Sequence, residues 1–544
     1  MNGVGTARLE GPAAELSVAA ELPGISLSDL VQELARWGIA AVASDPSAAV
    51  HGASIDSRAV DAGCLFVCKG AGFRPQFLSG ALGAGAAAYM CEAVVEPGGE
   101  PLRPPQELLD AAPGAPYLAV RGIRKAMARV SPLIFGHPER KLTIIGITGT
   151  KGKSTTAYML RSILRAAGQE PSILGSIETD DGAERFESHN TTPEAPDLWR
   201  HLFHTVQAGR TCMVMEVSSQ GLKYDRVLGL PLDIACFLNI GRDHISPIEH
   251  PTFEDYFASK LRIFDHAQTA VVNLATKELE RVMAAAAHAR RCVTTLAEMP
   301  GHEDGLAKDR TAHLPANLGA DHIAASAGGV DFEVAEGSER HRIRLGIPGL
   351  FNVENALVAI ACARQLGIGY DAIAAGLAHV RVPGRMEPVV SPDGKILALV
   401  DYAHNELSYE TLFHSVKAEY PKRKVVAVFG APGDKALERR EVLPRVAARY
   451  ADLLIYTEED PAHESVEQIC AELAAHTPDS VEHRIVCDRT EAIRQAFAWA
   501  QQAGEAVVLL LGKGDETRQH RGDAYPEVTS DLELARDILG VAER

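Results

Sequence analysis

The chain has 544 residues, of which 46% are hydrophobic and 23% are charged, so it can bury a large core in two to four domains. This composition excludes a chain that is disordered throughout. The formal net charge is −18 and no block rich in Lys and Arg stands out, which argues against a nucleic acid or an anionic membrane surface as the partner.

Cysteine usage and apolar patterning indicate the compartment. Nine cysteines are scattered singly, and the closest pair, Cys64 and Cys68, has no matching second pair, so neither a disulfide framework nor a zinc knuckle is predicted. The first residues lack a basic region followed by an apolar core, and no stretch approaches the ~18 apolar residues of a membrane span. We therefore expect a soluble cytoplasmic protein with reduced thiols.

In chain order, the first 20 or so residues are rich in Ala and Gly and are expected to form a loose tail. A first domain is predicted to end near Pro138, in the stretch FGHPERK. From Lys141 to about Val380, the apolar runs LTIIGI, CMVMEV, DIACFLNI and TAVVNL each precede a polar loop and a helical pattern. This alternation is typical of a doubly wound parallel sheet.

The stretch IIGITGTKGKSTTAYML, residues 144–160, predicts a strand, a glycine-rich turn and a helix that begins at Lys153. Such a turn aims backbone N–H groups and a helix dipole at one point, while Lys153 adds a charge and Ser154 or Thr155 can bind a metal. The ligand expected is a nucleoside triphosphate with Mg²⁺. Strict Walker spacing would need glycine where Ile147 stands, so this is a variant loop, and a plain turn is the alternative.

Two strands of the central region end in residues that suit a metal. CMVMEVSSQG places Glu216 at a strand end, and FLNIGRDH places Asp243 and His244 in the loop after another. Ligands of open parallel sheets bind beyond the carboxyl ends of the strands, so these groups and Ser154 could converge on Mg²⁺. A solvated strand terminus is the alternative for Glu216.

The helix TFEDYFASKLRIF places Lys260 within an apolar stripe that includes Tyr256, Phe257 and Phe264. A lysine there must extend to solvent, pair with an anion or lose its charge. The functional interpretation is a lysine that faces the site, either in contact with phosphate or carbamylated into an acidic metal ligand.

Between Gly301 and Gly346 the alternation loosens, which predicts an antiparallel excursion or a surface insertion. A second series follows, with strands in ILALVDY, KVVAVFG, DLLIYTE, HRIVCD and EAVVLLLG. We therefore predict an α/β fold of three domains, 1–138, 139–380 and 381–544: a smaller α/β N-terminal domain, a central doubly wound parallel-sheet domain and a Rossmann-like C-terminal domain. The polar strand ends DYAHN, FGAPGDKALERRE, TEEDPAHE and LGKGDETRQ predict a second binding face.

These motifs, in this order from DSRAVDAGCLFVCKG to GKGDETRQ, resemble the Mur ligases of peptidoglycan synthesis over nearly the whole chain, and specifically their MurE type. The resemblance implies an enzyme, an ATP-dependent ligase that adds the third amino acid to UDP-N-acetylmuramoyl-L-alanyl-D-glutamate. It implies three successive domains, for UDP, for ATP and for the incoming amino acid. The implied partners are these small molecules, and we expect a monomer.

The resemblance also assigns residues to the nucleotide and the metal. It implies a catalytic set of Lys153, Glu216, His244 and Lys260, and Mg²⁺ held by Ser154, Glu216, His244 and carbamylated Lys260. The implied ATP contacts are Gly149, Thr150, Lys151, Gly152, Lys153, Ser154, Thr155, Asn355, Arg385, Asp401 and His404.

The substrate residues follow in the same way. DSR gives Ser57 and Arg58 for UDP, NTTPE gives Thr191 and Thr192, and EVSSQGLKYDR gives Ser218, Tyr224 and Arg226 for the muramoyl dipeptide. Gln220 replaces the usual His, which puts that contact in doubt. For the amino-acid pocket the candidates are Lys435, Asp460, Gly512 and Glu516.

Relatives that select meso-diaminopimelate have DNPR where this chain has EDPA, residues 459–462. Without that Arg, a second carboxylate has no bidentate partner, and Asp515 adds negative charge near Glu516. L-Lysine is therefore the expected substrate, and L-ornithine or meso-diaminopimelate is the alternative. The rivals outside this activity are a folylpolyglutamate-type ligase and a nucleotide-binding paralogue without turnover.

Overall fold

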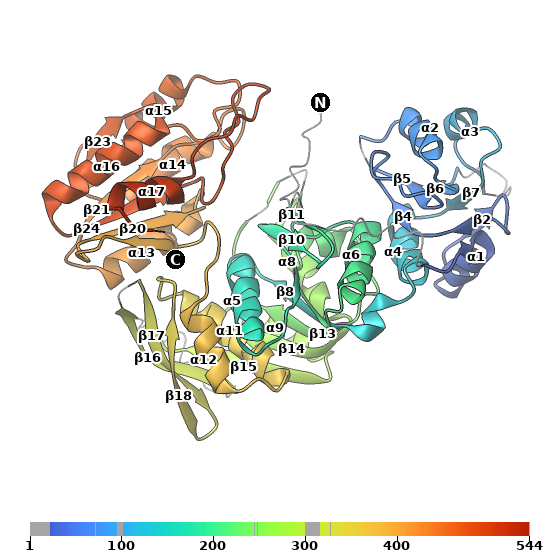
Figure 1. The fold of residues 1–544 in the computed structure, drawn as a ribbon, viewed down its shortest axis with the longest axis horizontal. Coiled ribbons are helices and arrows are strands. Elements are labelled where there is room, and N and C mark those ends of the chain that lie inside the picture. The colour runs from blue at the N-terminus through green and yellow to red at the C-terminus, as the bar shows by residue number, and fades with distance from the viewer. Residues whose placement is uncertain are drawn as a thin grey trace. The chain divides into compact units, whose positions relative to one another are not determined.

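The computed structural model describes residues 22–70, 72–94, 102–188, 190–243, 245–246, 249–299, 316–326 and 328–542 (Figure 1). The tail expected over the first 20 residues lies outside these ranges. The chain divides into two compact units, Met1–Thr294 and Thr295–Arg544, and each is described by itself. The first unit contains the predicted N-terminal domain and most of the predicted central domain; the three-domain boundaries stay a prediction.

The N-terminal part of the first unit is a five-stranded sheet of order β2-β7-β6-β5-β4, in which only β2 and β7 pair antiparallel. Buried apolar runs such as LFVC in β5 form its core. Its elements are β1 (Ile25–Ser26), α1 (Leu27–Arg36), β2 (Ala41–Ala43), β3 (Ala49–Val50), β4 (Ala53–Ser54), β5 (Leu65–Cys68), α2 (Pro75–Gly83), β6 (Ala88–Glu92), α3 (Gln106–Ala111), β7 (Tyr117–Val120) and α4 (Ile123–Ile134).

The second sheet of this unit has the order β11-β10-β9-β12-β8-β13-β14-β15, with a parallel centre from β9 to β14 and an antiparallel edge formed by β10 and β11. Its strands are β8 (Thr143–Thr148), β9 (Ser172–Leu174), β10 (Glu178–Asp180), β11 (Arg185–Glu187), β12 (Cys212–Glu216), β13 (Leu232–Phe237), β14 (Ala267–Asn273) and β15 (Arg291–Ala297). The four strand-like runs predicted for the central region are β8, β12, β13 and β14.

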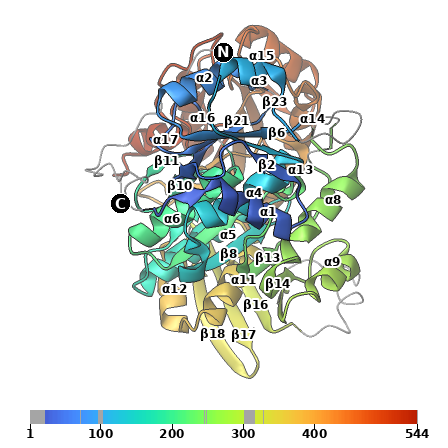
Figure 2. The same cartoon turned by 90° about the vertical axis from the view of Figure 1, so that its right-hand side faces the viewer.

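Helices cover both faces of this sheet because its central strands are apolar on both sides. Figure 2 shows α5, α6, α8 and α9 around β8 and β13. Thr205 of α6 hydrogen-bonds to Ser172 of β9, and Phe257 of α8 packs on Phe237 of β13; the strand register places both contacts on one face of the sheet. The helices are η2 (Pro138–Lys141), α5 (Lys153–Ala166), α6 (Ala195–Gln207), α7 (Ser219–Lys223), α8 (Phe253–Leu261), η3 (Arg262–Phe264) and α9 (Leu279–Ala286).

The second unit begins with an antiparallel meander, β16 (Leu318–Ser326), β17 (Gly329–Glu336) and β18 (Glu339–Leu345), followed by α11 (Asn352–Gln365) and α12 (Tyr370–Ala378). The structure thus has the antiparallel excursion predicted between Gly301 and Gly346; residues 300–315 lie outside the described ranges.

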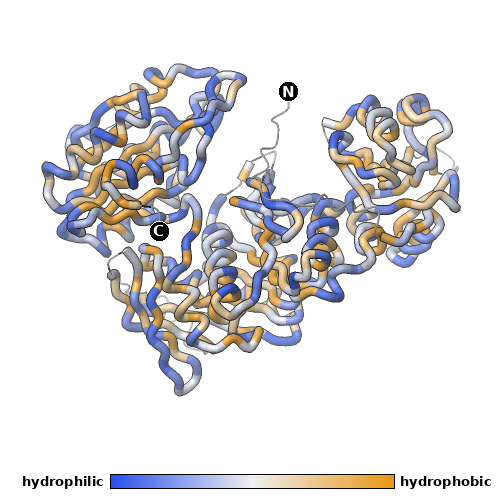
Figure 3. The backbone as a smooth tube through the Cα atoms, in the orientation of Figure 1, coloured by the Kyte–Doolittle hydropathy of each residue, from blue (hydrophilic) through white to orange (hydrophobic). Residues whose placement is uncertain are grey.

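The rest of this unit is a six-stranded sheet of order β19-β20-β24-β21-β22-β23, parallel except for the edge strand β19. Apolar clusters pack on both faces, and Figure 3 shows the hydrophobic residues concentrated along the strands. The elements are β19 (Glu387–Val390), β20 (Ile396–Asp401), α13 (Glu406–Glu419), β21 (Lys424–Phe429), α14 (Glu438–Ala447), β22 (Leu453–Tyr456), α15 (Val466–Ala475), β23 (Glu482–Ile485), α16 (Arg489–Ala503), β24 (Ala506–Leu511) and α17 (Asp531–Leu539). Among the described residues, no helix is both long and apolar enough to span a bilayer.

Candidate active site

The phosphate loop forms the sharp turn that the sequence predicts. β8 ends at Thr148, Gly152 has a left-handed backbone (φ 87°) that favours glycine, and α5 begins at Lys153. The Lys153 Nζ donates hydrogen bonds to the carbonyl oxygens of Gly149 (3.0 Å) and Thr150 (3.3 Å). The ammonium therefore lies over the loop at the N-terminus of a helix, where the helix dipole favours an anion.

Asn239, two residues after β13, holds the loop from the side. Its Oδ1 accepts a hydrogen bond from the Lys151 N–H (2.9 Å), its Nδ2 donates to the Lys151 carbonyl (3.1 Å), and its own carbonyl accepts from the Thr150 N–H (3.1 Å). The Thr150 hydroxyl lies 3.0 Å from the hydroxyl of Tyr256. Asn239 was not among the residues predicted from the sequence, although an Asn two residues after a buried strand was an available signal.

Three of the four predicted metal ligands lie in the described ranges. Ser154 is buried in the first turn of α5, and Glu216 is the last residue of β12, with 1% of its surface exposed. Glu216 pairs in register with Ile147, so the ends of β12 and β8 lie side by side at the carboxyl edge of the sheet. His244 lies outside the described residues.

The Glu216 carboxylate is fixed by the loop that follows β9. Its Oε1 accepts from the Ser176 N–H (2.9 Å) and its Oε2 from the Ser176 hydroxyl (2.9 Å). A Cβ at Gly175 would overlap Glu216 Oε1, so only glycine permits this approach. Glu216 is therefore a buried carboxylate in a fixed orientation and not a solvated strand terminus.

Thr192 joins the two predicted substrate motifs. Its hydroxyl donates to the Glu216 carbonyl (3.0 Å) and accepts from the Ser218 N–H (2.9 Å). Arg226 donates to the Thr192 carbonyl (2.8 Å) and forms an ion pair with Glu194 (3.0 Å). The structure thus brings Thr192, Ser218 and Arg226 together beside the predicted metal ligand, and the Thr191 hydroxyl contacts Ser176 (3.4 Å).

Two other residues of EVSSQGLKYDR face different neighbours. The Tyr224 ring lies under the guanidinium of Arg124, 4.5 Å from the ring centroid. The Gln220 Nε2 donates to Glu249 Oε1 (3.1 Å), so Gln220 is held by a carboxylate.

Lys260 is 2% exposed, and its Nζ donates to the Gly149 carbonyl (2.9 Å) above the ring of Tyr256. Burial, and secondarily the charge of Lys153, lowers the pKa of Lys260 well below its usual value, while Asp243 opposes the shift. The side chain therefore points at the phosphate loop and does not extend to solvent. That Lys260 contacts phosphate or is carbamylated stays a prediction.

In the N-terminal part, Arg58 is exposed and forms a bidentate pair with Asp56 of its own loop (2.6 and 2.9 Å), and Ser57 is half-buried beside it. Lys69, which was not predicted from the sequence, follows β5 and forms a buried ion pair with Glu194 of the NTTPE motif. This pair ties the N-terminal sheet to the predicted dipeptide motif.

In the second unit, the predicted ATP contacts Arg385, Asp401 and His404 lie around the end of β20, next to the start of β19. Asp401 accepts hydrogen bonds from the N–H groups of Met386 (2.8 Å) and Ala403 (2.7 Å). The Arg385 guanidinium lies 4.7 Å from the Tyr402 ring centroid, and His404 Nδ1 hydrogen-bonds to the Tyr402 carbonyl (2.7 Å). Asn355 is apart from them, on α11, where it donates to Asn352 (3.0 Å).

The predicted amino-acid pocket centres on Lys513, which sequence analysis did not single out. Lys513 is 2% exposed and forms ion pairs with Asp460 (2.8 Å) and with Glu516. Burial raises the pKa of Glu516, although Lys513 opposes the shift. Lys435 is exposed on the loop after β21. The structure therefore brings Asp460 and Glu516 together through a shared cation.

Two more acidic residues, Glu458 and Glu459, lie next to Asp460 in the loop after β22. Glu459 is buried against Gly512, where a Cβ would overlap its carboxylate, and burial raises its pKa to about 7 despite Arg489 and Arg439. Its neighbour Glu458 forms a bidentate pair with Arg521, whose side chain is half exposed.

Models of two domains match the chain: the Mur ligase middle domain over residues 147–363, and the Mur ligase glutamate ligase domain over residues 384–514. A UDP-N-acetylmuramyl-tripeptide synthetase from Lactobacillus delbrueckii subsp. bulgaricus is 35% identical over 511 residues, covering 90% of this chain and 93% of the relative. The chain belongs to the Mur ligase family. A UDP-N-acetylmuramoyl-L-alanyl-D-glutamate–L-lysine ligase from Enterococcus faecalis is 36% identical over 488 residues, covering 89% of this chain and 91% of the relative.

Solved Mur ligases share the fold. A UDP-N-acetylmuramoyl-L-alanyl-D-glutamate–2,6-diaminopimelate ligase aligns with a TM-score of 0.64 at 23% identity, covering 95% of this chain and 99% of that chain. Together the comparisons confirm the predicted MurE resemblance, the α/β fold class and the expectation of an enzyme, an ATP-dependent amide ligase of peptidoglycan synthesis.

Proposed function

We propose that this Mur ligase joins an amino acid to UDP-N-acetylmuramoyl-L-alanyl-D-glutamate at the expense of ATP, with L-lysine as the amino acid. One observation carries the proposal: relatives described as tripeptide synthetases and L-lysine ligases are 35–36% identical over about 90% of the chain. The geometry supports it, because the phosphate loop, Glu216 and the NTTPE motif meet at one edge of a parallel sheet.

In the proposed reaction the γ-phosphoryl group of ATP passes to the D-glutamyl side-chain carboxylate and ADP leaves. The incoming amine then attacks the acyl phosphate, and phosphate and a proton are released as the amide forms. The loop N–H groups and Lys153 hold the phosphates and offset the charge that develops during transfer. Thr192, Ser218 and Arg226 orient the dipeptide, so the reacting oxygen is positioned next to the nucleotide.

The residues present fit Mg²⁺. Ser154 and Glu216 offer hard oxygen ligands, and the two strand ends that bear the loop and Glu216 are adjacent. Bound Mg²⁺ would neutralise charge on the transferring phosphoryl group. His244 belongs to the proposed set.

We further propose that Lys260 is carbamylated. Carbamylation needs an uncharged amine, which adds to CO₂ with loss of one proton, and the buried position of Lys260 lowers its pKa in that direction. The product is an acidic oxygen donor beside the phosphate loop. Lys260 would then serve the metal as an anionic ligand.

The choice of L-lysine rests on charge in the second unit. Ala462 stands where relatives selective for a second carboxylate have Arg, and the loop before it contains Glu458, Glu459 and Asp460. A side chain that ends in ammonium suits such a pocket, whereas a buried carboxylate without a partner is unfavourable. Arg521 is the residue that would favour meso-diaminopimelate, because a guanidinium can pair with a second carboxylate. In the structure this guanidinium pairs with Glu458, which lies on a different loop.

The test is a phosphate-release assay with ATP, Mg²⁺ and the UDP-muramoyl dipeptide, supplied in turn with L-lysine, L-ornithine and meso-diaminopimelate. We expect turnover with L-lysine at a kcat/KM at least tenfold above the other two. A preference for meso-diaminopimelate would refute the choice of amino acid, and no turnover with any of them would refute the ligase. A control reaction tests for a folylpolyglutamate-type ligase: it contains glutamate and a folate acceptor in place of the amino acid and the UDP-muramoyl dipeptide.

A further inference from the structure

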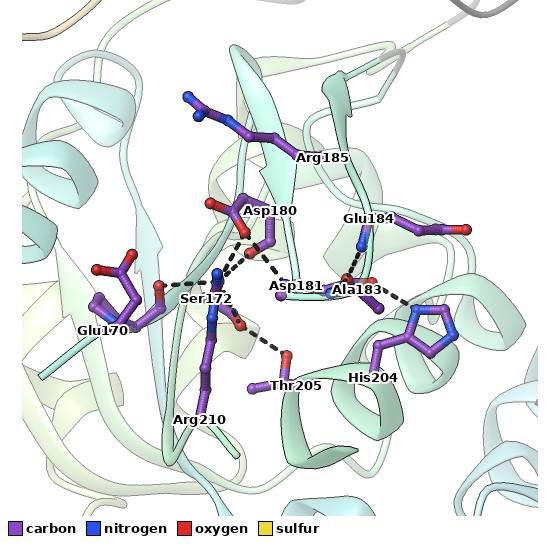
Figure 4. A network of polar contacts seen from close by, with 12 residues as sticks. Glu170, Ser172, Asp180, Asp181, Ala183, Glu184, Arg185, His204, Thr205 and Arg210 are labelled. Carbon is purple, nitrogen blue, oxygen red and sulfur yellow. Dashed lines mark hydrogen bonds and ion pairs between the residues drawn. The ribbon is translucent and has the colours of Figure 1, made fainter. Parts of the chain in front are cut away.

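A cluster of metal-ligating side chains lies outside the proposed active site, where the tip of the β10–β11 hairpin packs on α6. Asp181, Glu184, His201 and His204 each offer one ligand atom, and these atoms all lie within 4.8 Å of one another. Figure 4 shows Asp181 and Glu184 of the hairpin turn beside His204 of the helix.

The sequence spacing explains why the four groups converge. His201 and His204 are three residues apart on α6 and therefore lie on one face of the helix. Asp181 and Glu184 are three residues apart across a tight turn, in which Gly182 is left-handed (φ 94°). A Cβ at Gly182 would lie 2.5 Å from the Cβ of Ala208, at the end of α6, and 2.9 Å from Nε of Arg210, so a side chain there would displace the turn from the helix.

Each carboxylate is already oriented by the protein. Asp181 Oδ1 accepts from the N–H groups of Ala183 (2.9 Å) and Glu184 (2.7 Å), which directs Oδ2 at the helix. Arg200 holds Glu184 through Oε2 (2.7 Å), so its other oxygen can turn to a common ion. Such supporting contacts are what fix metal ligands in position.

Both histidines direct Nδ1 at the same oxygen. Asp181 Oδ2 lies 2.6 Å from His201 Nδ1 and 2.9 Å from His204 Nδ1, and all three side chains are at least nine-tenths buried. One oxygen of the Asp181 carboxylate therefore lies beside two ring nitrogens.

We propose that Asp181, Glu184, His201 and His204 form a structural site for a divalent transition-metal ion, and the ligand set favours zinc. Two imidazoles and two carboxylates complete a tetrahedral shell, whereas Mg²⁺ prefers oxygen ligands alone. Ligand atoms about 2.0–2.1 Å from a tetrahedral ion are roughly 3.3 Å apart. The His–Asp atoms must therefore separate by less than about an ångström to admit the ion.

The position of the site suggests what the ion does. The hairpin leaves from Ser176, which fixes Glu216, and α6 begins directly after the NTTPE motif. A metal that ties the hairpin to α6 stabilises both flanks of the proposed dipeptide site without touching substrate. The ion is a positioning element, independent of the Mg²⁺ proposed for the reaction.

The experiment uses the full chain after removal of metal with a chelator and reloading with Zn²⁺ or Co²⁺. Zn²⁺ content by mass spectrometry and titration with Co²⁺, followed by its visible absorption, are compared in the wild type, Glu184→Gln and Glu187→Gln. Glu187 is exposed on the same hairpin and outside the cluster, so Glu187→Gln is the matched control. The Glu184→Gln change leaves the Asp181–His contacts in place, and it therefore separates a metal site from a cluster held by hydrogen bonds alone.

We expect one equivalent of Zn²⁺ and an intense tetrahedral Co²⁺ spectrum in the wild type and in Glu187→Gln, and at least tenfold weaker binding in Glu184→Gln. Zn²⁺ should raise the unfolding midpoints of the wild type and Glu187→Gln, and it should raise that of Glu184→Gln much less. If the wild type takes up no stoichiometric Zn²⁺ and gives no tetrahedral Co²⁺ spectrum, the site does not exist; this outcome requires no variant to fold. Equal Zn²⁺ affinity of the two variants would overturn the assignment of Glu184.

Discussion

Replacing Thr192 with Val tests the link between the dipeptide motif and the end of β12. Thr192 is fully buried, and Val has nearly its shape but no hydroxyl. The change leaves the Glu216 carbonyl and the Ser218 N–H without their bonds of 3.0 and 2.9 Å. A buried polar group that loses its partner costs about 1–3 kcal/mol, so with two such groups we expect the free energy of unfolding to fall by about 2–6 kcal/mol.

The assay is thermal unfolding followed by intrinsic fluorescence, together with the KM for the UDP-muramoyl dipeptide. In a unit of this size, about 1 kcal/mol lowers the midpoint by roughly 2–4 °C, so the midpoint of the Val variant should be about 4–24 °C lower. Thr192→Ser is the control, because it keeps the hydroxyl and loses only the methyl group that packs against Gly221. Equal midpoints and equal KM values for the two variants would show that these hydrogen bonds do not hold the motif.

Three further predictions concern charged groups. Lys153→Ala should reduce turnover by at least about a hundredfold with an unchanged unfolding midpoint, since it removes a cation that offsets phosphoryl charge, and residual normal activity would contradict this role. Lys260→Ala should be inactive and regain activity with a short carboxylic acid in the assay, because the added carboxylate replaces the carbamate; failure of several such acids to restore turnover would count against the modification. Glu459 has a folded-state pKa of about 7, above the 4.5 of the free group, so the stability it contributes at low pH is lost as pH rises between these values. This loss of unfolding free energy amounts to about 3 kcal/mol. The unfolding midpoint of Glu459→Gln should therefore exceed that of the wild type at pH 8 but not at pH 4.5. If the midpoints of the two proteins depend on pH in the same way, Glu459 is not protonated in the folded state.

The sequence predicted the parts of the site that are encoded in local patterns. The loop from Gly149 to Thr155 is a continuous segment between an apolar strand and a helix, and the buried position of Lys260 follows from helical periodicity. The alternation of strands and helices likewise indicated a parallel sheet, whose carboxyl edge places Glu216 beside the loop.

What the sequence did not predict depends on contacts between distant segments. Asn239 holds the phosphate loop from 88 residues away, and Lys69 reaches Glu194 from another sheet. The His201–Asp181 contact needs the hairpin tip to fold onto α6, and no local period encodes that contact. Lys513 lies in the quoted motif GKGDE, but its burial between two carboxylates follows only from the meeting of two loops.

The two lysines of the phosphate loop share one acceptor, since Lys153 and Lys260 both donate to the carbonyl oxygen of Gly149. The positive charge of Lys153 favours the neutral amine of Lys260, whereas a polyphosphate on the loop would favour its ammonium form. Free enzyme should therefore react with CO₂ more readily than enzyme already loaded with nucleotide. The order of carbamylation and nucleotide binding then matters. When Lys260 of the purified enzyme has lost its carbamate, bicarbonate added before ATP should shorten the lag before full turnover.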